Sequence, residues 1–235
     1  MSTQVGDSAA FYRMQIGAWV RDRLLQTSNA MKLPAQGLDI FVVRNFLTKR
    51  ECDQLIDLID KDRQPSQLLS ESPDPEFRTS ESCNLRITDQ VNIETERKIN
   101  ALTGIQPEHG ETIQGQRYSV GQQFKEHHDF FYASEAYWPE QERQGGQRTW
   151  TAMIFLNEPE AGGQTAFPKA GIQVTPRAGN LLVWNNLDEY GEPNVYSLHT
   201  GRPVEAGVKY VITKWYRERP WGWYGAHGVT PTAPY

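Results

Sequence analysis

The sequence has few cysteines, no long apolar run and no cluster of basic residues. Its two cysteines, Cys52 and Cys83, have a spacing that suggests no metal site. Cys52 lies within an apolar helical pattern, which predicts a buried free thiol. No apolar run approaches the length of a membrane span, and the N-terminus lacks the basic start and apolar stretch of a signal peptide. We therefore expect a soluble, cytoplasmic protein without a membrane partner.

The charge composition argues against a nucleic-acid partner. The chain has 24 basic and 29 acidic residues and a formal net charge of −5. It lacks the run of lysines and arginines that such partners usually require, although an acidic average can conceal a local basic cleft. The 235 residues are enough for one domain with a substantial core.

Three helices are expected in the first third of the chain, over residues 8–28, from Thr48 onward, and over residues 93–103. Thr48 with Glu51 three positions later is a capping-box pattern, and Gly104 is a typical helix end. Residues at helical spacing predict the buried sides of the first two helices: Phe11, Met14, Ala18 and Leu25, then Leu55, Ile56 and Ile59.

The rest of the chain predicts a mainly β fold. Short β-branched and aromatic runs, separated by turn residues, are typical of a sandwich or jelly roll. The expected strands are 112–120, 149–156, 163–167, 172–175, 181–184, 195–199 and 209–216. Residues 64–86 are expected to form a long loop with a short hairpin, and residues 130–147 an excursion between strands.

A histidine and an aspartate one residue apart suggest a metal site. If His127 and Asp129 lie on a strand, both side chains point to one face while His128 points to the other. His199, at the end of an expected strand, is the best third ligand for a facial triad that leaves coordination positions open. Each histidine taken alone is more often an ordinary polar residue. His109 and His227 keep that ordinary interpretation.

Lys209 strengthens the metal hypothesis. It follows His199 by ten residues, across an expected hairpin with turn residues Gly201, Pro203 and Gly207. A lysine there could pair with a carboxylate of a dicarboxylic cosubstrate. Without the histidine, a solvated lysine at a strand edge would be the default interpretation.

From residue 38 to residue 219 the sequence resembles the prolyl 4-hydroxylase family of iron(II)- and 2-oxoglutarate-dependent oxygenases. The matching motifs are RTSES at 78–82, QRYSVGQQFKEHHDFF at 116–131, RTWTAMIFLN at 148–157, GGQTAFP at 162–168 and LHTGRPVEAGVKYVITKWY at 198–216. The resemblance implies a double-stranded β-helix, a jelly roll with helices packed on one side. It divides the chain into an N-terminal helical extension (1–37), an oxygenase domain (38–220) and a C-terminal tail (221–235).

The resemblance also assigns roles to individual residues. It makes His127, Asp129 and His199 the ligands of Fe(II). For 2-oxoglutarate it implies Lys209 as the partner of the distal carboxylate, with Thr213 and Tyr118 as hydrogen-bond donors. The residues at substrate positions are Arg148, Trp215, Arg78 and Thr79, the last two in a segment that closes over the peptide in relatives.

The implied activity is hydroxylation of a prolyl residue in a protein or peptide. The reaction uses O2 and converts 2-oxoglutarate to succinate and CO2, and ascorbate is a further candidate cofactor. Two positions depart from the family pattern: Phe155 and Phe124 stand where relatives often have tyrosine, near 2-oxoglutarate and near the substrate. The Phe124 difference weakens the inference to a prolyl substrate.

Several alternatives are left open. The enzyme could hydroxylate a free amino acid or another small molecule, and a nucleic-acid demethylase is a weaker alternative because the chain is acidic. A cupin-like jelly roll without catalysis would have the same strands. It would not need Lys209 and Thr213 at their positions after His199. The N-terminal helices could instead form a binding module or support a homodimer.

Overall fold

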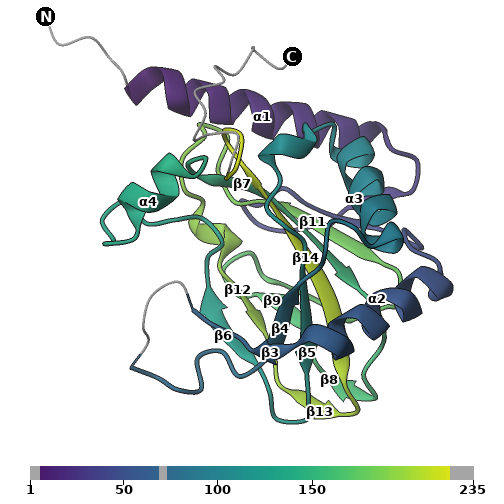
Figure 1. The fold of residues 1–235 in the computed structure, drawn as a ribbon. Helices are drawn as coiled ribbons and strands as arrows, with labels where there is room; N and C mark the ends of the chain where they lie inside the picture. The colour runs from purple at the N-terminus through teal and green to yellow at the C-terminus, as the bar shows by residue number, and fades with distance from the viewer. Residues whose placement is uncertain (1–5, 69–72, 223–235) are drawn as a thin grey trace, which may run out of the picture.

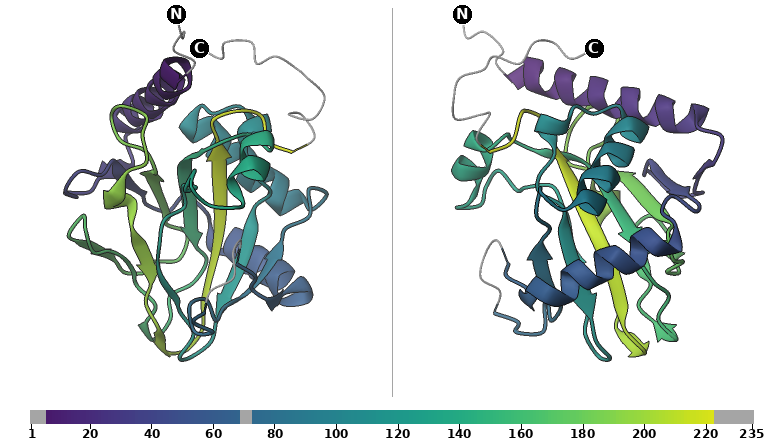
Figure 2. Two further views of the ribbon diagram at one scale, coloured as in Figure 1. Left: turned by 90° about the vertical axis from the view of Figure 1, so that its left-hand side faces the viewer. Right: turned by 45° about the vertical axis from the view of Figure 1, so that its right-hand side comes forward.

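The computed structural model describes residues 6–68 and 73–222, which form two facing antiparallel sheets with helices on one side (Figures 1 and 2). The helices are α1 (Gly6–Gln26), α2 (Lys49–Asp62), α3 (Gln90–Thr103) and α4 (Trp138–Arg143), with 3-10 turns η1 (Pro107–His109) and η2 (Val195–Ser197). The strands up to the middle of the chain are β1 (Ala30–Lys32), β2 (Ile40–Val43), β3 (Gln64–Pro65), β4 (Glu81–Asn84), β5 (Gln114–Tyr118), β6 (Phe124–His127) and β7 (Arg148–Phe155). The later strands are β8 (Ala161–Gly162), β9 (Thr165–Phe167), β10 (Ile172–Val174), β11 (Leu181–Asn185), β12 (His199–Gly201), β13 (Val204–Ala206) and β14 (Lys209–Arg217).

The large sheet has the order β1-β2-β11-β7-β14-β5-β4-β3, and the small sheet has the order β10-β9-β12-β6. A two-stranded ribbon of β8 and β13 lies outside both sheets. The arrangement is the mainly β jelly roll with helices on one side that the sequence predicted.

Strands β7 and β14 are central to the large sheet and buried on both faces. On β7, Trp150, Ala152 and Ile154 pack against α1, α2 and α3, while Met153 and Phe155 belong to the second core between the two sheets. Strand β14 alternates in the same way, because successive side chains on a strand point to opposite faces. One face of each strand therefore packs against the helices, and the other faces the interior between the two sheets.

The predicted capping box of α2 is present, with the Thr48 hydroxyl accepting from the Glu51 amide and the Glu51 carboxylate accepting from the Thr48 amide. Helix α3 ends as predicted at Gly104, whose φ of 75° is in the left-handed region that glycine adopts without strain. Leu55 and Ile59 are buried, as expected for α2.

The predicted buried side of α1 was wrong. Phe11 and Leu25 are 56% and 57% exposed, whereas Ile16, Val20 and Leu24 belong to the main core. The apolar residues of α1 define more than one possible buried face. Packing against the sheet buries a different face from the predicted one. Helix α1 thus contributes three residues to the main core.

Other local differences concern the strands. Residues 195–197 form the turn η2, so His199 begins strand β12 instead of ending a strand. Strands β1 and β2 were not predicted, and the predicted short hairpin in residues 64–86 is present as β3 paired with β4. The expected hairpin between His199 and Lys209 is wrong, because β12 lies in the small sheet and β14 in the large one.

Two predictions from composition can be compared with the described residues. Cys52 is buried and free, and burial raises the pKa of its thiol to about 11. In residues 6–68 and 73–222, none of the helices combines the length and the apolar character needed to cross a membrane. The tail from residue 223 and His227 lie outside the described residues.

The capping box predicts a measurable contribution to stability. Replacing Thr48 by alanine removes the side-chain oxygen that accepts from the first turn of α2, so the free energy of unfolding in urea should fall by about 1 kcal/mol. Thr48→Ser keeps the hydroxyl and should retain most of the stability. Equal loss in the two variants would show that the cap does not stabilise this helix.

Candidate active site

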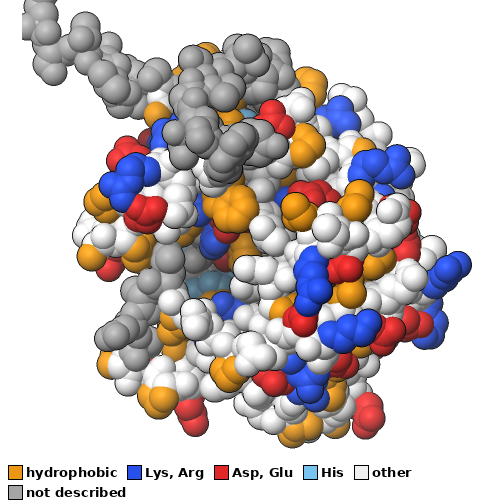
Figure 3. All heavy atoms as spheres, viewed as in Figure 1, with side chains coloured by type: hydrophobic (Ala, Val, Ile, Leu, Met, Phe, Trp, Pro, Cys, Tyr) orange, Lys and Arg blue, Asp and Glu red, His pale blue; other side chains and the backbone are white. Residues whose placement is uncertain are grey.

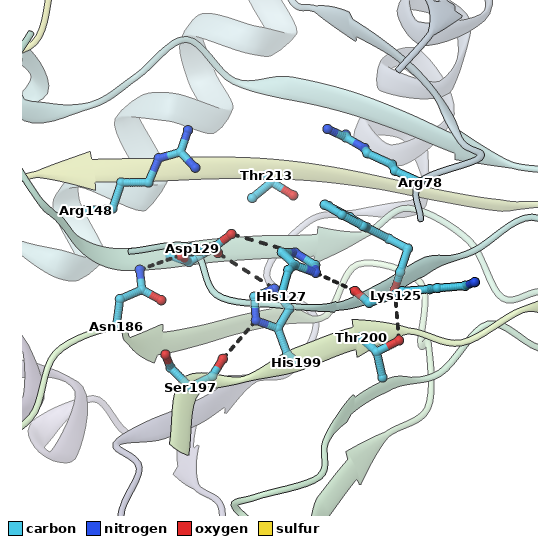
Figure 4. A network of polar contacts seen from close by, with 12 residues as sticks. Arg78, Lys125, His127, Asp129, Arg148, Asn186, Ser197, His199, Thr200 and Thr213 are labelled. Atoms are coloured by element: carbon cyan, nitrogen blue, oxygen red, sulfur yellow. Dashed lines mark hydrogen bonds and ion pairs between the residues drawn. The ribbon is translucent and has the colours of Figure 1, made fainter. Parts of the chain in front are cut away.

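Three side chains that can bind a metal converge between the two sheets (Figure 4). Nε2 of His127 lies 3.9 Å from Oδ1 of Asp129, and Nε2 of His199 lies 3.8 Å from Oδ2 of the same carboxylate. His127 and His199 are antiparallel Cα partners on β6 and β12, so backbone pairing brings the two rings together. The ligand atoms of all three residues lie within 4.8 Å of one another. Two imidazoles and one carboxylate on one edge can form a facial triad for a divalent ion.

The two histidine rings are held in the orientation that a metal requires. Nδ1 of His127 lies 2.8 Å from the carbonyl of Lys125, and Nδ1 of His199 lies 2.9 Å from the carbonyl of Ser197. A carbonyl only accepts, so each Nδ1 carries the hydrogen and each Nε2 has a free lone pair. Burial, and then the neighbouring His199, hold the pKa of His127 well below its usual value, which favours the neutral ligand form.

Asp129 is positioned by tertiary contacts and not by a strand. Strand β6 ends at His127, so the carboxylate stands two residues beyond it, and the strand alternation predicted for this pair stops short of Asp129. Its Oδ2 accepts a hydrogen bond of 2.7 Å from the hydroxyl of Thr151 on β7. Burial opposes ionisation of Asp129, but His199, His127 and Arg148 outweigh it and lower the pKa of the carboxyl.

A small inner cavity extends from the triad into the sandwich and contains a buried lysine side chain. The cavity has a volume of about 40 Å³, and Lys209, Thr213 and Tyr118 all line it. Lys209 is 2% exposed, and within the described residues its ammonium has no hydrogen bond or ion pair. Burial lowers the pKa of Lys209 to about 7. Such a group is suited to an anionic ligand that would supply the missing partner.

Thr213 and Tyr118 are linked through Gln116. Nε2 of Gln116 donates to the Thr213 hydroxyl at 3.1 Å, which leaves the hydrogen of Thr213 for another acceptor. The Tyr118 hydroxyl donates to Oε1 of Gln116 at 2.7 Å, so its hydrogen is engaged within the protein. Thr213 is therefore the available donor here, and the donor role predicted for Tyr118 would require this bond to break.

A larger outer cleft of about 740 Å³ opens from the other side of the triad to the surface. Figure 3 shows this hollow with histidine at its floor. Its lining is strongly aromatic and includes Phe77, Phe124, Phe130, Phe131, Tyr132, Tyr137, Trp215 and Trp221. The volume is in the range of ligand-binding pockets. His127, Asp129, Phe124 and Trp215 line both spaces, so the triad lies where the cavity and the cleft meet.

Arg148 lies in the cleft with most of its donors fixed. Its Nε and Nη2 donate to the two carboxylate oxygens of Glu111 at 2.6 and 2.7 Å, and its guanidinium stacks over Trp215 at 4.2 Å. Glu111 also accepts from Arg217. Burial opposes ionisation of Glu111, but the two arginines lower the pKa of its carboxyl. The Arg148 fork is thus oriented by the protein, and Nη1 is the nitrogen that remains for a ligand.

The other two residues predicted at the substrate differ from each other. Arg78 lines the cleft, donates to Gln114 at 2.7 Å and lies 4.7 Å from the Phe124 ring. Thr79 lines neither the cavity nor the cleft, since its amide and hydroxyl both contact the backbone of Gln123. Thr79 therefore holds the neighbouring segments together and does not face a ligand.

His128 points away from the triad, as predicted. Its Nδ1 lies 2.8 Å from the Tyr132 hydroxyl and its Nε2 lies 3.4 Å from the carbonyl of Val195. Phe124 stacks on the His127 ring with centroids 3.6 Å apart, and Phe155 lies beside the Lys209 ammonium. Phe124 therefore lies against a ligand histidine, and Phe155 lies against the lysine of the inner cavity.

Four residues of the site were not found from the sequence: Gln116, Glu111, Thr151 and Asn186. Gln116 could have been found, because it shares a strand face with Tyr118 two positions later. Thr151 lies among the apolar residues of β7, and a polar residue in such a run is a usable signal. Glu111 and Asn186 lie outside the strands, where no local pattern points into the site.

The chain is similar to known proteins in sequence and in fold. The family model of the 2OG-Fe(II) oxygenase superfamily matches residues 113–217. The Arabidopsis thaliana protein named "Probable prolyl 4-hydroxylase 8" is 33% identical over 200 residues, which cover 75% of this chain and 67% of that protein. The viral collagen prolyl hydroxylase of Paramecium Bursaria Chlorella virus-1, solved as its 2OG complex, is 25% identical with a TM-score of 0.61 over 76% of this chain and 95% of that one.

A more distant structure shows the shared fold alone. It is a prolyl hydroxylase from Trichoplax adhaerens in complex with a hypoxia inducible factor oxygen degradation domain peptide fragment. It is 16% identical, with a TM-score of 0.59 over 92% of this chain and 94% of that one.

The buried ammonium of Lys209 predicts a pH-dependent stability of the protein without metal or ligand. Because its folded pKa is lowered from 10.5 to about 7, stability is fully present only above the unfolded value and is lost as the pH falls toward about 7. Lys209→Met should therefore be more stable than the wild type near neutral pH. This difference should shrink by about 2 kcal/mol between about pH 7 and about pH 9 in denaturant titrations. A difference that stays constant over this range would contradict the prediction.

Proposed function

Because the chain belongs to the prolyl 4-hydroxylase family of 2OG-Fe(II) oxygenases, we propose that it hydroxylates a prolyl residue in a protein or peptide. The enzyme is a 2-oxoglutarate-dependent dioxygenase that requires Fe(II), 2-oxoglutarate and O2. With these bound, the site converts 2-oxoglutarate to succinate and CO2 and places one oxygen atom on the substrate.

The observation that supports the proposal best is that the triad separates two chemically different spaces. The inner cavity is small and holds the Lys209 ammonium, which has no ion pair within residues 6–68 and 73–222, and this suits a compact dianion. The outer cleft is large, aromatic and open to solvent, which suits a polypeptide. A metal held between them can contact a cosubstrate on one side and a substrate on the other.

The donor set fits Fe(II). His127 and His199 would bind through Nε2, since a backbone carbonyl faces each Nδ1, and Asp129 would supply the anionic ligand. Metal-ligating histidines usually donate their other ring N–H to such an acceptor, which fixes the tautomer.

The inner cavity fits 2-oxoglutarate. Lys209 would pair with the distal carboxylate, and Thr213 would donate its hydroxyl hydrogen to the same group. The loss of one hydroxyl at Phe155 is tolerable while Lys209 and Thr213 remain. Because the ammonium is buried and has no ion pair among the described residues, the dianion would supply the opposite charge that stabilises it.

The outer cleft fits a proline-containing chain. Trp215 offers an apolar face to a pyrrolidine ring, and the fixed guanidinium of Arg148 offers Nη1 to a backbone carbonyl. Aromatic side chains across the cleft are the surface that extended proline-rich segments bind. Arg78 adds a second cation at the same mouth.

Some inferences from the sequence stay predictions. They are ascorbate as a cofactor, a cytoplasmic location, a homodimer, the absence of nucleic-acid and membrane partners, and the division into an extension, a domain and a tail.

The proposed function predicts that proline-containing peptides gain one oxygen atom when incubated with the enzyme, Fe(II) and 2-oxoglutarate. Mass spectrometry of the peptides should show this gain on proline, and free proline should remain unmodified. Arg148→Ala should raise the KM for peptide at least about tenfold, the loss expected for one charged hydrogen bond, with an unchanged KM for 2-oxoglutarate. The fold should survive, because Glu111 keeps its partner Arg217. Efficient turnover of free amino acids without any peptide product would replace the proposal by the small-molecule alternative.

The proposed role of Lys209 predicts how its replacement changes the KM for 2-oxoglutarate. In Lys209→Ala, the distal carboxylate loses a charged partner worth about 1.5–3 kcal/mol, so the KM for 2-oxoglutarate should rise at least about tenfold. The KM for peptide at saturating 2-oxoglutarate should change little. An unchanged KM for 2-oxoglutarate would assign the anchoring role to another residue.

A further inference from the structure

We infer that Thr151 and Asn186 are positioning residues that hold Asp129 as an anionic metal ligand. The inference rests on the proposed metal site and concerns two residues that contribute no metal-binding atom themselves. Nδ2 of Asn186 donates to the Thr151 hydroxyl at 2.8 Å, and that hydroxyl donates to Oδ2 of Asp129 at 2.7 Å. Figure 4 shows Asn186 beside the carboxylate on the side away from the two histidine rings.

The direction of this hydrogen-bond chain follows from the chemistry of its members. An ionised carboxylate only accepts, so the single hydrogen of the Thr151 hydroxyl must point to Asp129. The lone pairs of the hydroxyl then accept from the NH2 group of Asn186. The amide oxygen of Asn186 is consequently left buried without a hydrogen-bond partner within the described residues. The Asn186 amide is thus oriented so that its NH2 group supports the hydroxyl bound to Asp129, while its own oxygen has no hydrogen-bond partner among the described residues.

Asp129 needs such support because no strand fixes it. It lies two residues after the end of β6, whereas Thr151 lies on β7, which pairs with β11 on one side and β14 on the other. Gln147 fixes the same segment from the backbone side, accepting from the amide of Phe131 and donating to its carbonyl. The metal-binding segment is therefore attached to a central strand of the large sheet by the Thr151 hydroxyl, and to the residue before that strand by the Gln147 side chain.

The chain is also fully enclosed. Thr151 and Asn186 are each 0% exposed, so water cannot replace either donor without a change in packing. Asn186 is itself held by its backbone, which donates to the carbonyl of Thr149 and accepts from the amide of Asn194. Loss of the hydroxyl should leave Asp129 with more than one orientation and a less favourable ionised form. Partners of this kind typically change metal affinity by about 10–100-fold.

The test measures binding of Co(II), an air-stable probe for Fe(II), by its visible absorption, without 2-oxoglutarate or substrate. Thr151→Val, which keeps the shape and loses the hydroxyl, should raise the Kd for Co(II) about 10–100-fold, and Thr151→Ser should stay within about threefold of the wild type. Thr149→Val is the matched control. Thr149 is a buried threonine two residues earlier on the same strand, and its hydroxyl bonds to the carbonyl of Tyr216 and not to the triad. Its Kd should equal that of the wild type.

Asn186→Ala provides a second test and a check on the mechanism. It should raise the Kd in the wild-type background and should have little further effect in the Thr151→Val background, because it acts through the same hydroxyl. If Thr151→Val does not fold, the comparison of Asn186→Ala with Thr149→Val decides the question alone. Unchanged affinity in Thr151→Val or Asn186→Ala, with only the Tm of the metal-free protein lowered, would show that the chain merely satisfies buried polar groups. Failure of the metal site itself is recognised separately, because the wild type and His127→Ala would then bind Co(II) equally.

Discussion

The site depends on the burial of β7 and β14 on both faces. A strand that is covered by helices on one side and by a second sheet on the other can place polar groups in an apolar interior only where ligands or partners compensate them. On β14, the face toward the small sheet carries Lys209, Thr213 and Trp215, all of which line the inner cavity. On β7, the same interior face carries Thr151, which bonds to Asp129. Alternate residues of the same two strands therefore pack against the helices and line the site.

The two spaces around the triad treat charge in opposite ways. In the inner cavity, the Lys209 ammonium is buried without a partner among the described residues, and burial lowers its pKa to about 7. In the outer cleft, Arg148 is neutralised and oriented by Glu111. An unpaired buried cation gains most from a small anion that becomes fully enclosed. A paired and stacked guanidinium offers orientation with little net charge, which suits recognition of a neutral backbone.

Two aromatic residues of the site, Phe155 and Phe124, stand where relatives often have tyrosine. Phe155 and Phe124 keep the aromatic ring and lose a hydrogen-bond donor. The Phe124 ring stacks on His127 and lies under Arg78, so it shields one ligand from solvent and shapes the cleft. The polar selection of the substrate in this chain must therefore come from other groups of the cleft, which include the guanidinium groups of Arg148 and Arg78 and the carboxylates of Glu126 and Glu135.

The sequence by itself determined the fold class, the capped helix at Thr48 and the residues that could bind a metal, because short strand-like runs between turn residues, a capping box and a His-x-Asp motif are local patterns. Only the tertiary structure brings Thr151 and Asn186 to Asp129, because Thr151 lies on β7, Asn186 directly follows β11, and the sheet pairs these two strands. It also decided which face of α1 is buried, since Ile16 and Leu25 both fit a helical stripe and only packing against the sheet separates them. Local periodicity determines which residues lie on the same face of a helix or strand. Which face is buried depends on contacts between residues far apart in the chain.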